Sequence, residues 1–173
     1  MSPLRYTVRR AEIGDAGIIA YHRVSMFAEM GEVATDGLGA ALLEASRVAL
    51  AALLADDGYV GWVATDRENS VVAGAGAHIK PQLPRMSLDG ARVVTAPVPL
   101  VVNVYTEPSW RNHGIARVLM EVLMEWAAEH GFDRLVLHAS HGGRFLYQSL
   151  GFVGTNEMRW AVGSKGEAER ASG

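Results

Sequence analysis

Residues 101–116 have the sequence VVNVYTEPSWRNHGIA, and this stretch decides the fold. Its first part is an apolar run typical of a buried strand, which we predict over residues 100–105. Its last part leads directly into a helix with one apolar face, at spacings i, i+3, i+4, i+7, i+8 and i+11. That face is formed by Ile115, Val118, Leu119, Val122, Leu123 and Trp126. The stretch therefore predicts a strand, a loop and an amphipathic helix in direct succession.

The loop between strand and helix, residues 111–116, is called the anion loop below. A helix N-terminus has free N–H groups and a partial positive charge, so it suits a phosphate or a pyrophosphate. Gly114 allows a ligand to approach the backbone closely, and Ala116 keeps the next turn small. Arg111 adds a charge-assisted donor. Together these residues predict a phosphate site.

Two other phosphate motifs are excluded by their missing residues. A Walker loop needs Gly-Lys followed by Ser or Thr, and the anion loop has no lysine. The dinucleotide fingerprint needs a third glycine, whereas Gly74 and Gly76 are followed by His78 and Ile79. We expect these two glycines to mark a strand with a close backbone neighbour.

Two segments resemble the GNAT superfamily of acetyltransferases. Residues 111–116, RNHGIA, resemble the family's Q/R-x-x-G-x-G/A signature, and residues 146–152, LYQSLGF, resemble its L-Y-x-x-x-G-F segment. The spacing between them fits one helix and one strand. The close resemblance covers residues 100–160, and the order of elements before it (strand, two helices, hairpin) is also that of the family.

The resemblance implies an α/β fold with a mixed, mostly antiparallel twisted sheet and helices on both faces. Its two central parallel strands, ending near Tyr105 and Ala139, would splay apart. Acetyl-CoA would be the cosubstrate, with its pantetheine in the wedge, paired to backbone at Val104, Tyr105 and Thr106. Its pyrophosphate would lie on amides of the anion loop, which comprises Arg111, Asn112, His113, Gly114, Ile115 and Ala116. Many members carry a coenzyme-contacting Asn where this chain has Ser140, which can donate one hydrogen bond and cap the following helix.

Acetyl transfer to an amine needs a neutral amine, a donor for the developing oxyanion and a proton for the leaving thiolate. A backbone N–H near Val104 or Tyr105 suits the oxyanion. Tyr147 matches the family's general acid, and a phenol pKa of about 10 lies above a thiol's ~8.5. The alternative, that Tyr147 only packs near the sulfur, stays open.

The general base also stays open. Glu157 is a candidate on the predicted last strand, residues 152–162. The other candidates are Glu29, Glu32 and His138, or a water relay. We predict that residues 26–37 and 80–99, both irregular in pattern, form the acceptor entrance.

The remaining helices and strands are predicted from the periodicity of apolar residues and from capping and turn residues. We expect strands at residues 6–10, 59–65, 71–79 and 134–139, and helices from a cap at Asp15, at 38–54 and at 143–150. Residues 26–37 are expected to be a helix end and a connection. Residues 1–162 are predicted to form a single domain, with a disordered tail over 163–173.

Composition narrows the function. The chain has 173 residues, a net charge of −3 and no cysteine. This charge argues against a nucleic-acid partner. We identified no signal peptide, no apolar run near ~18 residues and no metal site, so we expect a cytoplasmic protein that does not bind a membrane. The predicted function is N-acetylation of a small-molecule amine, such as an amino acid, a polyamine or a drug-like amine. A silent coenzyme A-binding or sensing domain and a protein or aminoacyl-tRNA acetyltransferase are the alternatives, and a homodimer is left open.

Overall fold

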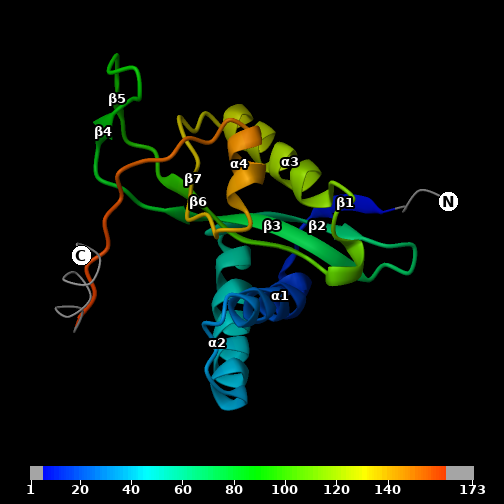
Figure 1. Cartoon of the computed structure of the whole chain (residues 1–173). Helices are drawn as coiled ribbons and strands as arrows, with labels where there is room; N and C mark the ends of the chain where they lie inside the picture. Colours follow the sequence, from blue (N-terminus) through cyan, green and yellow to red (C-terminus); the bar gives the residue numbers. More distant parts are fainter. Residues whose placement is uncertain (1–5, 163–173) are drawn as a thin grey trace.

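The computed structural model describes residues 6–162 and contains a central five-stranded sheet with helices on both faces (Figure 1). The strand order is β1 (Thr7–Arg10), β2 (Tyr59–Thr65), β3 (Val71–Lys80), β6 (Val98–Thr106) and β7 (Val136–Leu137). The first four strands are antiparallel to their neighbours, and β6 and β7 are parallel. The predicted mixed, mostly antiparallel sheet is confirmed.

Two helix layers cover this sheet. Helices α1 (Ala16–Glu29) and α2 (Asp36–Ala55) lie on one face, and α3 (Ile115–Glu129) and α4 (Arg144–Ser149) lie on the other. Two short 3-10 turns, Ile13–Asp15 and Pro108–Trp110, precede α1 and α3. Arg9 on β1 binds both carboxylate oxygens of Asp15, at 2.7 and 2.8 Å, and so fixes the entry into α1.

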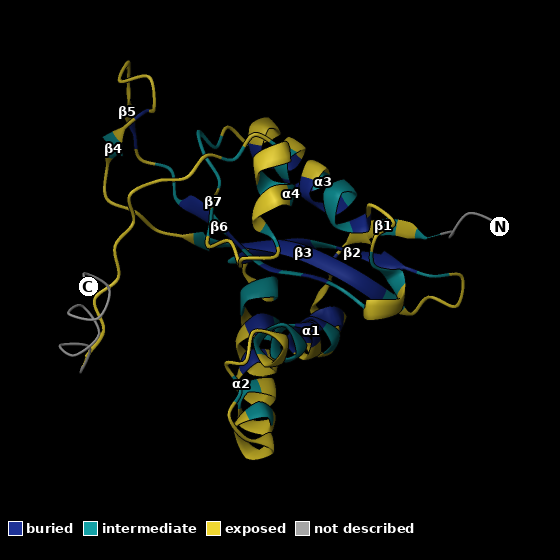
Figure 2. Cartoon of the chain, viewed as in Figure 1, coloured by how far each residue is buried: buried dark blue, intermediate teal, exposed yellow. Residues whose placement is uncertain are grey.

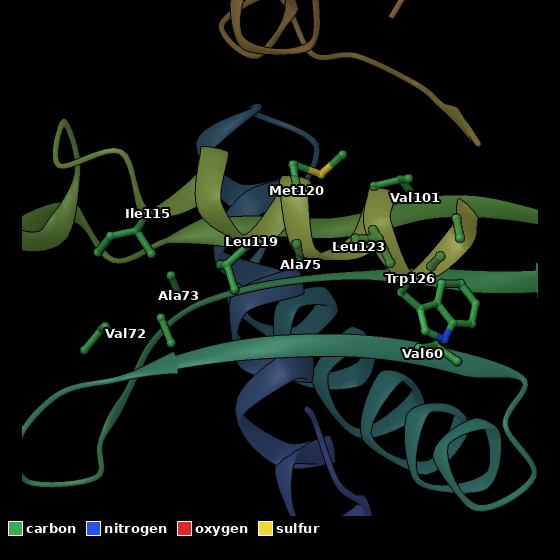
Figure 3. Close-up of a cluster of buried hydrophobic side chains, with 13 residues drawn as sticks. Val60, Val72, Ala73, Ala75, Val101, Ile115, Leu119, Met120, Leu123 and Trp126 are labelled. Carbon is green, nitrogen blue, oxygen red and sulfur yellow. The ribbon is translucent and has the colours of Figure 1, made fainter. Parts of the chain in front are cut away.

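The larger hydrophobic core lies between α3 and the sheet. The central strands of the sheet are mostly buried (Figure 2). Four residues of the predicted apolar face, Ile115, Leu119, Leu123 and Trp126, are at most 8% exposed there (Figure 3). Val118 and Val122 are only partly buried, and Met120, which was not predicted for this face, is fully buried. Alternating small residues on β3, such as Ala73 and Ala75, let α3 approach the strand closely. A second core, under α1 and α2, contains Ile19, Leu50, Tyr59 and Val63.

The closest neighbour of Gly76 on β3 is a side chain and not the expected backbone. A Cβ on Gly76 would lie 2.2 Å from the hydroxyl oxygen of Tyr59 and 2.3 Å from its Cζ. A Cβ on Gly74 would meet only ordinary contacts, at 3.6 Å or more. Tyr59 therefore lies across β3 because Gly76 has no side chain.

Several predicted boundaries are corrected by the structure. Residues 80–99 contain a two-stranded hairpin, β4 (Arg85–Met86) and β5 (Val93–Val94), and the strand predicted at 134–139 shortens to β7. Helix α2 begins two residues earlier than predicted, because the Thr35 hydroxyl accepts a hydrogen bond from the Leu38 amide at 3.3 Å and caps it. The predicted tail at 163–173 lies outside the described residues.

The strand predicted at residues 152–162 does not form. The segment leaves α4 and runs away from the sheet (Figure 1), and it pairs with no strand within residues 6–162. Met158 and Trp160 are 94% and 80% exposed. Its alternating apolar pattern is that of a strand, but β7 is too short to pair with it along its length.

Helix α2 contradicts the expectation that no apolar run approaches membrane-spanning length. Over Asp36–Ala55 it is long and apolar enough by composition, and most of it is exposed (Figure 2). Its exposed side also carries the ion pair Glu44–Arg47, at 2.7 Å. A single helix of this kind is weak evidence for a membrane span, and the inner side of α2 packs in the second core through Leu50.

Candidate active site

The two parallel strands diverge soon after they meet. Strands β6 and β7 pair only at Leu100 with Val136 and at Val101 with Leu137, whereas β6 continues to Thr106. Between Val101 and Thr106, no strand among the described residues pairs with this edge of β6. This part of β6 therefore offers free backbone groups to an extended ligand.

A β-bulge deforms β6 at the same place. Gly76 pairs with Val102 and Gly74 with Tyr105, so one residue of β3 lies opposite two residues of β6. Asn103, in the bulge, has φ 58°, a conformation that asparagine tolerates better than most residues. The bulge turns Asn103 towards α1, where its Oδ1 accepts a hydrogen bond from Arg23 at 2.8 Å.

A pocket of about 400 Å³ lies where β6 ends and α3 begins. Gly114, the N-cap of α3, has φ 76° and no atom within 4 Å of where a Cβ would stand. The pocket is lined by Thr106, Trp110, Arg111, Asn112, Gly114, Ile115, Ala116, Arg117, Gly142 and Leu146. The Thr106 hydroxyl is buried and has no partner among the described residues. A polar group in the pocket would satisfy it.

The structure brings most of the predicted anion loop to this pocket, but not every predicted contact. Val104 packs against the α3 core, and Tyr105 points to the α1 side. His113 is exposed, with Nδ1 3.3 Å from the Trp110 carbonyl oxygen. The Ser140 hydroxyl accepts a hydrogen bond from the Gly143 amide at 3.2 Å, but Gly143 is itself the N-cap of α4, so Ser140 does not cap the helix as predicted. Among residues 6–162, no three metal-ligating side chains cluster.

The comparisons with known proteins agree with this geometry. The model of the acetyltransferase (GNAT) family matches residues 27–152. The chain belongs to this family. No curated protein sequence matches the chain.

Solved structures of acetyltransferases share the fold. A GCN5-related N-acetyltransferase from Ralstonia eutropha JMP134 is 31% identical with a TM-score of 0.80, over 91% of this chain and 99% of its own. A predicted acetyltransferase from Clostridium acetobutylicum, solved with acetyl-CoA, is 25% identical with a TM-score of 0.77, over 91% and 96%. Glucosamine-6-phosphate N-acetyltransferase from Arabidopsis thaliana is 16% identical with a TM-score of 0.60, over 92% and 99%, and shows the fold alone.

In this member of the acetyltransferase family, Arg111 is tied to both the end of β6 and α1. Its Nη2 donates to Glu29 Oε1 at 2.6 Å, and its Nε donates to the Thr106 carbonyl oxygen at 2.8 Å. The Tyr105 hydroxyl donates to the same Glu29 oxygen at 3.1 Å. The Arg111 hydrogen bond holds the pKa of Glu29 below its usual range. Glu29, a candidate base, is therefore an anion with two partners.

Tyr147 and Glu157, the predicted catalytic pair, are held in different ways. The Tyr147 ring is half-buried on α4 and makes an edge contact with Phe152, at 6.0 Å between centroids. Burial raises the pKa of its phenol, so the hydroxyl keeps its proton at neutral pH. Glu157 lies in the exposed segment, 3.4 Å from His138 Nδ1, and does not line the pocket.

The structure contains a polar cluster on the α1 side of β6 that the sequence analysis did not predict. His22 is 1% exposed and lies 3.1 Å from Glu107, and burial lowers the pKa of its imidazole. Asn103 also hydrogen-bonds the buried Tyr59 hydroxyl, whose pKa burial raises to about 12. The partners are far apart in sequence. The only local signal is that Arg23 lies one helical turn after Ile19 on a buried face, where an apolar residue is expected.

Proposed function

We propose that the chain is an acetyl-CoA-dependent N-acetyltransferase that acetylates the amine of a small molecule. Members of the acetyltransferase (GNAT) family use acetyl-CoA, and the observation that carries the proposal is the pocket at the N-terminus of α3. The free edge of β6 leads into it, and Leu146, the residue before Tyr147, lines it. The pocket thus lies next to the helix that carries Tyr147.

The pocket residues fit this cosubstrate. The amides at Gly114, Ile115 and Ala116 begin a helix, and their partial positive charge suits a pyrophosphate. The unpartnered Thr106 hydroxyl can bond a pantetheine amide that runs along the edge of β6. Acetyl-CoA supplies an activated acetyl group as a thioester. The described residues supply its binding, its orientation and a proton.

In the proposed reaction, the lone pair of a neutral amine attacks the thioester carbonyl carbon. A carbon–nitrogen bond forms, the carbon–sulfur bond breaks, and the amine loses one proton. A backbone N–H near Val104 or Tyr105 stabilises the charge that develops on the carbonyl oxygen. Tyr147 donates its phenolic proton to the thiolate, which suits a phenol that burial keeps protonated.

The proton from the amine needs an acceptor. Glu157 stays the predicted base, and this role requires residues 152–162 to move towards the wedge. Glu29 is a poorer base, because its hydrogen bond from Arg111 lowers its pKa. A water relay fits the same geometry without moving the segment.

A small amine as acceptor is supported by the character of the fold relatives. They include a glucosamine-6-phosphate N-acetyltransferase and an aminoglycoside N-acetyltransferase solved with CoA. The net charge of −3 is unfavourable for an aminoacyl-tRNA. Residues 26–37 and 80–99 stay the predicted acceptor entrance, and a cytoplasmic location stays a prediction.

The deciding experiment measures free thiol released from acetyl-CoA in the presence of a panel of amines. We expect at least one amine to accelerate the release, and a panel without effect would favour a silent binding domain. Calorimetry on Gly114→Asp should show acetyl-CoA binding weakened at least tenfold, about 1.4 kcal/mol, because the new carboxylate repels the pyrophosphate.

Gly90→Asp is the matched control. Gly90 also has a positive φ, 70°, and no atom within 4 Å, but it lies in the turn between β4 and β5. The Gly90→Asp substitution should strain the backbone as much as Gly114→Asp does, without changing acetyl-CoA affinity. Equal affinities of the Gly114→Asp variant and the wild type would exclude this pocket as the phosphate site.

A further inference from the structure

The guanidinium of Arg23 is unusual among the arginines of this chain. It lies half-buried between α1 and β6, with its Cζ 4.8 Å from the centroid of the Phe27 ring. Its Nη1 donates to Asn103 Oδ1 at 2.8 Å. Burial lowers its pKa, although arginine keeps its charge at any physiological pH.

Within residues 6–162, Arg23 forms no ion pair. The other half-buried arginines each have a carboxylate: Arg85 and Arg134 have Asp133, Arg111 has Glu29, and Arg117 has Glu121. Two acids of the site have other partners, since Glu29 bonds Arg111 and Tyr105, and Glu107 bonds His22. A charge withdrawn from water is costly unless it is paired, so a cation held only by a neutral amide and an aromatic ring indicates an anionic ligand.

The position of Arg23 relates it to the reaction. It contacts Asn103, the bulge residue, which directly precedes Val104 at the point where β6 and β7 have diverged. It approaches from the α1 face of the sheet, whereas the coenzyme pocket opens beside α3 and α4. An acceptor that enters from the α1 side would meet the guanidinium beside the reacting groups.

We infer that Arg23 binds a carboxylate of the acceptor, so that the substrate class is an amine that also carries a carboxylate, such as an α- or ω-amino acid. This inference rests on the proposed function. The planar guanidinium donates to Asn103 through one N–H and has further N–H groups for a two-point contact with a carboxylate. Such a contact orients the acceptor, because it fixes the carboxylate end while the amine faces the thioester.

The test compares acceptors that differ only in charge: glycine with glycinamide, and 4-aminobutyrate with butylamine. We expect kcat/KM to be at least about tenfold higher for the carboxylate member of at least one pair. In Arg23→Gln this preference should fall by about tenfold or more, with KM for acetyl-CoA unchanged. Arg47→Gln is the matched control, because it removes the same charge from an exposed site on α2 and should change neither value.

Asn103→Asp gives a second test that keeps the arginine. It places a carboxylate 2.8 Å from the guanidinium and should preserve folding, since aspartate also tolerates the left-handed backbone of residue 103. The built-in carboxylate then competes with that of the acceptor. We expect this variant to lose the preference for carboxylates even if Arg23→Gln does not fold.

The outcomes separate this inference from the proposed function. Equal use of the charged and uncharged members of both pairs by the wild type would overturn the inference and leave the acetyltransferase intact. A preference for glucosamine 6-phosphate over every amino acid would overturn the inference, because Arg23 would then bind a phosphate of the acceptor and not a carboxylate. If no amine is acetylated, ligand-detected NMR with glycine and 4-aminobutyrate still decides. Binding that Arg23→Gln abolishes supports the anion site, and no binding overturns it.

Discussion

The carboxylate of Glu29, at the end of α1, lies 2.6 Å from the guanidinium of Arg111, at the start of the anion loop. This contact joins the layer beneath the sheet to the loop that leads into α3 above it. It also places a negative charge beside the pocket proposed for the pyrophosphate. Glu29 therefore shares an arginine that the ligand would also use. Removing the Glu29 carboxylate should change acetyl-CoA affinity more than the free energy of unfolding.

We predict that Glu29→Gln tightens acetyl-CoA binding several-fold at low salt, because the carboxylate no longer competes for Arg111. The free energy of unfolding should change by less than about 1 kcal/mol, since both side chains are more than a third exposed. Calorimetry at two ionic strengths measures the effect. Glu32→Gln, which removes a nearby exposed carboxylate, is the control, and weaker binding in Glu29→Gln would show that the pair instead holds the loop in its binding geometry.

Replacing Tyr147 by Phe removes the hydroxyl and keeps the ring against Phe152. We expect kcat to fall by roughly tenfold to a hundredfold, the lower part of the range for a positioned acid, with little change in KM for acetyl-CoA. Burial raises the phenol pKa above its usual ~10, so the difference from wild type should persist past pH 10 and shrink only at higher pH. Tyr21→Phe, at an exposed tyrosine, is the control. A loss confined to KM would make Tyr147 a binding contact.

The carboxylate of Asp133 anchors the β4–β5 hairpin, because it bonds Arg85 on β4 at 2.5 Å and Arg134 at 2.9 Å. Despite the opposing effect of burial, these partners hold its pKa below the usual range. We predict that Asp133→Asn lowers the free energy of unfolding by about 3 kcal/mol at pH 7, since two half-buried guanidinium groups lose their counter-charge.

The pH dependence of this effect has a definite sign. A carboxylate whose folded pKa is lowered stabilises the fold above its unfolded pKa of about 3.9, and this stabilisation is lost as the pH falls through the folded pKa. The difference between wild type and Asp133→Asn should thus shrink below about pH 4 in urea titrations. Asp57→Asn, at an exposed pair with Arg10, should show almost no difference at any pH, and a difference for Asp133→Asn that does not vary with pH would contradict the assignment.

Local chemistry predicted the centre of the fold from sequence. The strand, the anion loop and the apolar face of α3 follow from residues within about thirty positions, and the structure places them as expected. The bulge at Asn103 could not be predicted, because it depends on the register that β6 takes against β3. The Arg23–Asn103 and His22–Glu107 contacts span 80 and 85 residues, so no local pattern reveals them. The prediction for residues 152–162 is wrong for the opposite reason. Their local pattern is that of a strand, but no described strand pairs with them.

The close fit of Tyr59 over Gly76 gives a stability prediction. Gly76→Ala should lower the free energy of unfolding by about 1–3 kcal/mol, because its methyl group would overlap the phenol ring. Gly74→Ala is the matched control on the same strand, and it should change stability by much less, since its methyl group meets only ordinary contacts. Thermal unfolding with the double variant Gly76→Ala/Tyr59→Val should show a favourable coupling between the two sites. Strictly additive losses would mean that the ring moves aside freely.

The contact between Tyr59 and Gly76 also constrains the order in which related chains can diverge. A side chain at position 76 costs less stability once position 59 has lost its ring, so the two changes are favoured in that sequence over the reverse. Losing the ring also removes the hydroxyl that Asn103 contacts, and Asn103 is what Arg23 is bonded to. A descendant with a side chain at position 76 is therefore expected to have first passed through an ancestor with a loosened Arg23, and a change of acceptor would precede the change in the strand.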